Sequence, residues 1–298
     1  PERPELEGRV ENAFRYALPT IENGYGFDYN MCYSEEARAK GVVVGWEPKE
    51  REETIYHYPS YGGDLMANDA ASGTSTQGVN GSMARFSIYG KYLYTVEQNI
   101  MCVFDLSGDK PVLTTNDIWL QRGVETLFNY KDKMFMGTPT GMLIYSLEDS
   151  LEDPLAPKYR SSVSHVFGCD PVVVEDDLAY VTVHSGNTCG QNTNELMLID
   201  VSDVDQPNLL VTYGMKCPKG LGIDNGTLFL CDEGLKVFNA KDPMTLLANQ
   251  LVHYAGMEGY DVIPFKNTLM MIADDGLYQY DYSNLQAISQ LSKLPMGE

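Results

Sequence analysis

The stretch Leu196-Met197-Leu198-Ile199-Asp200-Val201-Ser202-Asp203 decides the fold of this 298-residue chain, because degenerate copies of it recur along the sequence. The copies lie at 101–107, 142–147, 235–240 and 277–282. Each copy carries one polar marker, and the markers in chain order are Asp105, Ser146, Asp200, Asn239 and Asp281. Successive markers are 41, 54, 39 and 42 residues apart. A period near 40 residues with no helix in the unit is typical of a β-propeller.

Alternating apolar residues and turn signals predict the same four-stranded plan in every repeat. In the repeat that contains the quoted stretch, we expect strands at 171–174, 178–183, 196–201 and 209–213. The five repeats span about 83–118, 124–163, 169–213, 220–251 and 260–291. Such a sheet buries both of its faces only against neighbouring blades. The predicted fold class is therefore an all-β propeller of stacked, four-stranded antiparallel blades.

The first 82 residues depart from the period. Residues 1–10 resemble the outer strand that follows a signature strand, as at 206–212. The sequence thus predicts that the chain begins partway through a blade, and that upstream residues would bring the total to six or seven blades. Residues 11–82 are interpreted as an insertion between blades, with a short helix, a two-stranded hairpin and a flexible loop. An insertion of this length either frames a binding face or decorates the scaffold.

The composition favours strands and a strongly acidic surface. Hydrophobic residues make up 43% of the chain and aromatic residues 11%, which is enough for a sizeable core. The formal net charge is −21, and so acidic a surface repels nucleic-acid phosphates and anionic lipid headgroups. The sequence contains no run near the ~18 apolar residues that a membrane span requires. We therefore expect no nucleic-acid partner, and membrane association only through a lipid anchor outside this chain.

Six cysteines show neither a C-x-x-C motif nor zinc spacing with the four histidines. Cys102 and Cys231 lie within apolar strand patterns, which predicts small buried core residues. Cys169 opens a predicted inner strand, and Cys189 lies in a loop rich in Gly, Asn and Thr. We predict a disulfide between Cys169 and Cys189, with Cys217 as the competing partner.

Longer tracts extend beyond the signature strand, at 81–86, 169–174, 220–224 and 274–281. Together with Leu196-Met197-Leu198-Ile199-Asp200 they resemble the LVIVD-repeat β-propellers, a family of predicted surface or secreted lipoproteins of Bacteroidetes and other bacteria. The resemblance covers roughly 81–291. Two repeats depart from the family pattern, with Ser146 and Asn239 in place of Asp. We expect the turn after the strand to survive, because Ser and Asn also form such turns.

The resemblance implies a propeller exported through a lipoprotein signal that would precede Pro1, and located in the outer membrane, at the cell surface or in the periplasm. It implies no particular reaction. An oxidising compartment permits disulfides, which supports the predicted bridge between Cys169 and Cys189.

Propellers bind ligands mostly where the innermost strands enter the central channel. Aligning the inner hairpins places charged and polar side chains at this rim, and the predicted ligand-binding residues are Arg85, Glu125, Thr126, Asp170, Lys219 and Asp261. Converging carboxylates suit a hard cation such as calcium, a sugar, or an acid/base pair for glycoside cleavage. The same side chains can instead hydrogen-bond only the neighbouring backbone and channel water. No metal is assigned.

The sequence contains no G-x-S-x-G elbow, P-loop, G-x-G-x-x-G or H-E-x-x-H motif. We interpret the chain as a non-enzymatic exported scaffold for protein interactions at the bacterial surface or in an outer-membrane complex. Its expected partners are other surface or outer-membrane proteins, or a glycan. The alternative is a glycan- or cation-binding module, or a hydrolase- or lyase-type enzyme, that uses the acidic channel mouth. An apolar patch away from the axis favours the scaffold, and titratable groups that converge in a pocket favour the enzyme.

Overall fold

The structure is a computed structural model that describes residues 81–97, 99–120, 123–147, 156–164, 171–184 and 193–296. The predicted outer strand at 1–10 and most of the predicted insertion at 11–82 lie outside these residues. So do Asp170 and both cysteines of the predicted disulfide, Cys169 and Cys189. The described residues belong to one compact unit of the chain.

The described residues form five four-stranded antiparallel sheets, which we call blades 1 to 5 in chain order. Blade 1 contains β1 (Phe86–Tyr89), β2 (Tyr92–Glu97), β3 (Ile100–Asp105) and β4 (Val112–Trp119). Blade 2 contains β5 (Thr126–Tyr130), β6 (Lys133–Thr138), β7 (Gly141–Ser146) and β8 (Lys158–Ser164). Blade 3 contains β9 (Val172–Glu175), β10 (Leu178–Val183), β11 (Glu195–Asp200) and β12 (Asn208–Gly214). Blade 4 contains β13 (Pro218–Asp224), β14 (Thr227–Asp232), β15 (Leu235–Asn239) and β16 (Gln250–Tyr254). Blade 5 contains β17 (Asp261–Phe265), β18 (Thr268–Ala273), β19 (Gly276–Asp281) and β20 (Ser289–Pro295).

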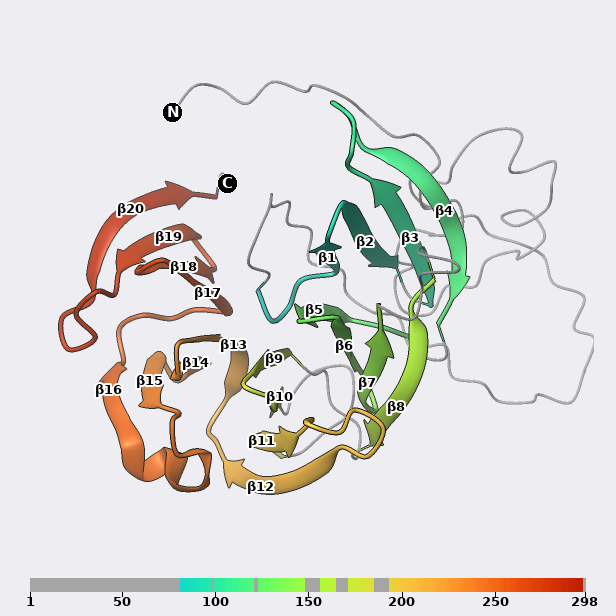
Figure 1. The fold of residues 1–298 in the computed structure, drawn as a ribbon. Coiled ribbons are helices and arrows are strands. Elements are labelled where there is room, and N and C mark those ends of the chain that lie inside the picture. Colours follow the sequence, from blue (N-terminus) through green and yellow to red (C-terminus); the bar gives the residue numbers. More distant parts are fainter. Residues whose placement is uncertain are drawn as a thin grey trace, which may run out of the picture. The chain divides into compact units, whose positions relative to one another are not determined.

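The blades are arranged around a common axis, with β1, β5, β9, β13 and β17 innermost (Figure 1). Consecutive blades meet through these innermost strands. The predicted all-β propeller is therefore confirmed. Within the described residues, no helix is long and apolar enough to cross a membrane.

The signature strand is the third strand of each blade, and a polar residue at its end turns the chain. The carboxylates of Asp105, Asp200 and Asp281 each accept a hydrogen bond from the backbone N–H two residues later, at 2.7, 2.9 and 2.8 Å. Hydrogen bonds from the side chain and the backbone N–H of the serine at that position lower the pKa of each carboxyl, that of Asp105 to about 2. Asn239 Oδ1 accepts the equivalent bond from Lys241 N at 3.2 Å. The turn therefore survives the change to Asn, as predicted.

The hydrophobic core lies between consecutive blades, because neighbouring side chains along a strand point to opposite faces of the sheet. In β7, Leu143 belongs to the cluster between blades 1 and 2, and Ile144 belongs to the cluster between blades 2 and 3. Leu198 packs into the cluster with blade 4, and Phe229 packs into the cluster with blade 5. Each of these four side chains is buried. Cys102 and Cys231 are also buried, as their strand patterns predicted.

The β13–β14 turn and the β15–β16 connection both contact the preceding blade 3. Asn225 and Gly226 both have positive φ in the β13–β14 turn, which is typical of an Asn-Gly hairpin. Glu175 of blade 3 accepts a hydrogen bond from each of their backbone N–H groups, at 2.9 and 2.6 Å. The 3₁₀ helix η2 (Pro243–Asn249), which was not predicted, connects β15 to β16. It buries Leu246 in the cluster between blades 3 and 4.

Candidate functional site

The described residues of the predicted ligand site all lie where innermost strands begin. Arg85 precedes β1, Glu125 and Thr126 stand at the start of β5, Lys219 lies in β13, and Asp261 opens β17. Asp170 lies outside the described residues. Backbone hydrogen bonds join these strand starts between blades, from Leu127 N to Ala84 O and from Gly220 N to Tyr260 O, each at 2.7 Å. The structure divides the predicted residues into two groups, one on blades 1 and 2 and the other on blades 4 and 5.

The first group pairs Arg85 with two carboxylates. The Arg85 guanidinium forms an ion pair with Glu97 at 3.7 Å, and both side chains are about one third exposed. Burial raises the pKa of Glu125, and the positive charge of Arg85 opposes that shift. Thr126 beside it is buried and pairs with Gly137 across the sheet. This group is a small charged cluster in which the positive charge of Arg85 acts on both Glu97 and Glu125.

Asp261 in the second group is buried and binds the segment that leads into blade 1. Its carboxylate accepts hydrogen bonds from Ser82 Oγ at 2.8 Å and from Met83 N at 3.2 Å. Ser82 Oγ also accepts a bond from Leu221 N of blade 4 at 2.9 Å. Burial raises the pKa of the Asp261 carboxyl to about 6, against the hydrogen bonds that lower it. Asp261 therefore acts as a clasp between blades 4 and 5 and the lead-in to blade 1.

Glycines leave the space that this clasp occupies. A Cβ atom on Gly81 would lie 2.2 Å from Asp261 Oδ2, and a Cβ on Gly220 would lie 2.1 Å from Asp261 Oδ1. Both distances are far inside van der Waals contact. The carboxylate can approach the two backbones only because neither residue has a side chain.

Lys219 lies beside the clasp and joins three blades. Thr182 of blade 3 donates a hydrogen bond to Lys219 O at 2.7 Å. The Lys219 ammonium lies 4.4 Å from the centre of the Tyr260 ring of blade 5, a cation–π contact. Burial lowers the pKa of His184, and the nearby Lys219 charge lowers it further. Within the described residues no ion pair neutralises the Lys219 ammonium.

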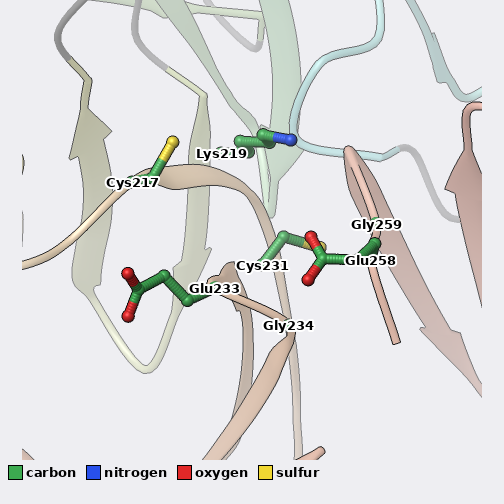
Figure 2. Close-up of a pocket in the computed structure, with 7 residues that line it drawn as sticks. All are labelled: Cys217, Lys219, Cys231, Glu233, Gly234, Glu258 and Gly259. Atoms are coloured by element: carbon green, nitrogen blue, oxygen red, sulfur yellow. The ribbon is translucent and has the colours of Figure 1, made fainter. Parts of the chain in front are cut away.

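A cavity of about 330 Å³ opens next to Lys219, between the strand ends of blades 4 and 5 (Figure 2). Its lining residues are Cys217, Lys219, Cys231, Glu233, Gly234, Glu258 and Gly259. Figure 2 shows the side chains of Glu233 and Glu258 apart from each other, on separate segments of the chain. One cation and two carboxylates thus surround a space large enough for a small polar molecule.

The walls of this cavity are held by a buried carboxylate. Asp232 accepts hydrogen bonds from the backbone N–H groups of Lys216 and Cys217, at 3.1 and 2.6 Å, and forms an ion pair with Lys236 at 2.6 Å. Glu233 follows it with a positive φ of 49°, a conformation that is strained for a residue with a side chain. Asp232 therefore fixes the segment before β13 and the β14–β15 turn, which together form part of the cavity lining.

The two thiols at the cavity differ in environment. Cys217 is an exposed free thiol, whereas Cys231 is free and buried. Burial raises the pKa of Cys231, and the nearby Asp261 charge raises it further, so this thiol is unreactive. Among the residues that the structure describes, no three His, Cys, Asp or Glu side chains come together to hold a metal ion.

Sequence reasoning missed several residues that build this region. Ser82 was placed at the end of a predicted insertion, yet its hydroxyl is buried and bridges blades 4 and 5. Glu233 and Glu258 lie outside the strands, so strand alternation gave no signal for them. Only the alignment of the strand starts could have brought Tyr260 and Lys219 together.

Comparison with known proteins supports the fold. No protein-family model matches the sequence, and no curated protein matches it either. A functionally unknown protein from Desulfotomaculum acetoxidans is 10% identical with a TM-score of 0.54, over 75% of this chain and 72% of that one. Apo AztD from Citrobacter koseri is 13% identical with a TM-score of 0.49, over 70% of this chain and 61% of that one. BamB from Moraxella catarrhalis is 9% identical with a TM-score of 0.41, over 71% of this chain and 62% of that one. These likenesses concern the propeller fold alone, and the LVIVD-repeat family stays a prediction.

The clasp predicts a pH dependence of stability. The Asp261 pKa is about 6 in the folded protein against its ordinary value of 3.8, so the folded state holds this proton more tightly than the unfolded state. The resulting stabilisation is present below pH 3.8 and is lost as the pH rises through 6. The difference between the two pKa values corresponds to about 3 kcal/mol in the free energy of unfolding.

The measurement is the free energy of unfolding of the wild type minus that of Asp261→Asn, from pH 4 to pH 7. The variant cannot titrate at this position, and the surface carboxylates contribute equally to both proteins and cancel. We expect the difference to fall by about 2 kcal/mol as the pH rises over this range. A flat difference would contradict the buried, raised-pKa carboxyl.

Proposed function

We propose that the protein is a non-catalytic β-propeller scaffold that binds another protein, exported to the bacterial surface or an outer-membrane complex. The observation that carries the proposal is an exposed apolar patch on blade 5, away from the axis. Ile272, Leu294 and Met296 are 39, 67 and 56% exposed. Ile272 pairs with Leu277 across the sheet, and Leu277 pairs with Leu294, so the patch is continuous over three strands. Contiguous apolar surface of this kind marks interaction sites.

The channel-mouth residues give less support to catalysis. Acid/base cleavage needs two titratable groups that face one substrate. The Asp261 carboxylate oxygens accept hydrogen bonds from Ser82 Oγ and from backbone N–H groups, and Glu125 lies near Arg85. In the described residues these two carboxylates therefore serve separate local contacts.

The scaffold proposal predicts a complex that depends on the blade 5 patch. Isolated under mild conditions from cells that naturally produce it, the 33.2 kDa chain should migrate in a larger assembly of fixed stoichiometry. The double variant Ile272→Asp with Leu294→Asp should weaken that assembly by about tenfold or more, since each change places a charge in an apolar interface. Native mass spectrometry measures both results.

The matched control is Val112→Asp with Trp119→Asp, which changes two exposed apolar residues on β4 of blade 1. We expect this variant to keep the assembly. A wild-type chain that stays monomeric at its native concentration would contradict the scaffold function.

The cavity beside Lys219 favours a second candidate function, which is binding of a neutral glycan at the channel mouth. Lys219, Glu233 and Glu258 offer hydrogen-bond donors and acceptors to sugar hydroxyls, and the partly exposed Tyr260 ring suits stacking against a sugar. Calorimetric titration with neutral oligosaccharides should then give binding that Lys219→Ala reduces by about tenfold. Uronic-acid oligosaccharides of the same length are the control, because the two carboxylates repel their charge. Equal binding of acidic and neutral sugars, or undiminished binding by the variant, would exclude this cavity as the recognition site.

A further inference from the structure

The cavity beside Lys219 contains more negative than positive charge. Its lining includes one ammonium group, on Lys219, and two carboxylates, on Glu233 and Glu258, which gives a net charge of −1. Neither carboxylate forms an ion pair or a side-chain hydrogen bond within the part of the chain that the structure describes. Charges that line a concave site concentrate their field inside it. The cavity therefore favours a ligand that carries a positive charge.

Other carboxylates at this end of blades 4 and 5 are satisfied by the protein itself. Asp232 forms an ion pair with Lys236 at 2.6 Å and also accepts backbone hydrogen bonds. Asp274 accepts a hydrogen bond from the hydroxyl of Tyr260. The two glutamates of the cavity differ from these carboxylates, because their oxygens are available to a bound molecule.

The negative charge also reaches the buried part of the lining, where the Cys231 thiol is only 1% exposed. Burial raises the pKa of this thiol, the charges of Asp261 and Glu258 raise it further, and the charge of Lys219 opposes them. Two carboxylates and one ammonium thus act on the same atom. The buried part of the cavity therefore also favours positive charge.

The Cys231 thiol is itself a polar group without a partner. It is free, and none of the residues that the structure describes forms a hydrogen bond with it. Most buried polar groups in proteins have at least one partner. A thiol is a weak donor and a weak acceptor, so a ligand that carries hydroxyl groups can supply the missing contact.

A metal ion fits this cavity less well than an organic cation. Calcium takes about six to eight oxygen ligands, and no three His, Cys, Asp or Glu side chains come together among the described residues. Figure 2 shows Glu233 and Glu258 on separate segments of the chain, with the Lys219 ammonium as a third charged group of the lining. An ammonium group of a ligand donates only three hydrogen bonds, so it does not need a cage of carboxylates.

The remaining features of the cavity suit a sugar ring. Tyr260 directly follows the lining residue Gly259, and it is 40% exposed. An aromatic ring of this kind can stack against a sugar. The volume of about 330 Å³ lies at the lower end of the ordinary range of ligand sites, about 300–1,000 Å³. The cavity is therefore suited to a small polar unit and not to a bulky apolar one.

We propose that this cavity binds a glycan through an amino sugar whose amino group is free and therefore positively charged. The proposal rests on the glycan-binding candidate above and names the sugar. The ammonium donates charge-assisted hydrogen bonds to the carboxylates that line the cavity, and the ring stacks against Tyr260. The sugar hydroxyls contact Lys219 and the Cys231 thiol. An acetylated amino sugar lacks the charge, so it leaves Glu233 and Glu258 without a cationic partner.

Calorimetric titration with matched tetrasaccharides tests this proposal. The chitosan, chitin and cellulose tetramers share one linkage, and they differ only in carrying a free amine, an acetylated amine or a hydroxyl on each ring. The titrations are made at about pH 6, where an amine is protonated, and at about 0.15 M salt, which screens the overall charge of −21. We expect the chitosan tetramer to bind about tenfold more tightly than either of the others.

Two double variants locate the binding site. Glu233→Gln with Glu258→Gln removes both carboxylates of the cavity at nearly constant side-chain size, and we expect it to weaken chitosan binding by about tenfold or more. The matched control is Asp109→Asn with Asp176→Asn. It removes two exposed carboxylates, from the β3–β4 connection of blade 1 and the β9–β10 turn of blade 3, and we expect it to keep full affinity. Circular dichroism verifies that each variant is folded.

Each contrary outcome has a distinct meaning. Equal binding of the three tetramers would overturn the amino sugar and leave glycan binding standing. Undiminished chitosan binding by the cavity variant, or an equal loss in the surface control, would overturn the cavity as the amine site. Tetralysine that binds as tightly as the chitosan tetramer would show that charge alone is recognised, which would overturn the sugar. No binding of any tetramer would overturn both the proposal and the glycan-binding candidate.

Discussion

A four-stranded sheet with apolar side chains on both faces is stabilised mainly by covering those faces, and the whole molecule depends on this constraint. Leu143 and Ile144 are neighbours on β7, yet they belong to the cores on opposite sides of blade 2. Burial of apolar area supplies about 25 cal/mol per Å², and here nearly all of it is gained between blades. No blade has a core of its own. The blades therefore support one another in series around the axis.

This arrangement explains why polar chemistry concentrates at the strand ends. The faces of the blades are occupied by packing, so charged groups are left to the turns and to the starts of the innermost strands. Some of these groups hold the ring together. Asp261 fixes the lead-in to blade 1 through Ser82, and Asp232 fixes the segment before β13. Others, such as Lys219 and Glu258, remain around a cavity.

Much of the fold could be predicted from sequence, because its determinants are local. The marker spacing depends on strand length and turn chemistry. Asp200 and Asn239 both accept a hydrogen bond from the backbone N–H two residues later, as expected of these residue types in turns. The helix η2 was missed because a short 3₁₀ segment after Pro243 has no periodic signal. The clasp between Ser82 and Asp261 joins residues 179 positions apart, and no local pattern reports such a contact. Alignment of the strand starts found Asp261 but not its partner, since the role of a carboxylate depends on what lies opposite it.

Sequence alone also could not distinguish blade 5 from its neighbours. Gln279 and Leu294 fit a strand pattern as well as Val237 and Tyr254 do, and only the ring geometry shows that their side of the sheet is exposed. The central claim is that each blade is stabilised by burial against its neighbours. Hydrogen exchange of the isolated protein tests it most directly, through the opening free energies of amides in β18–β19 and β14–β15. The account predicts lower opening free energies in β18–β19, because blade 5 has one exposed face and blade 4 has none. Equal or greater protection in β18–β19 would contradict it.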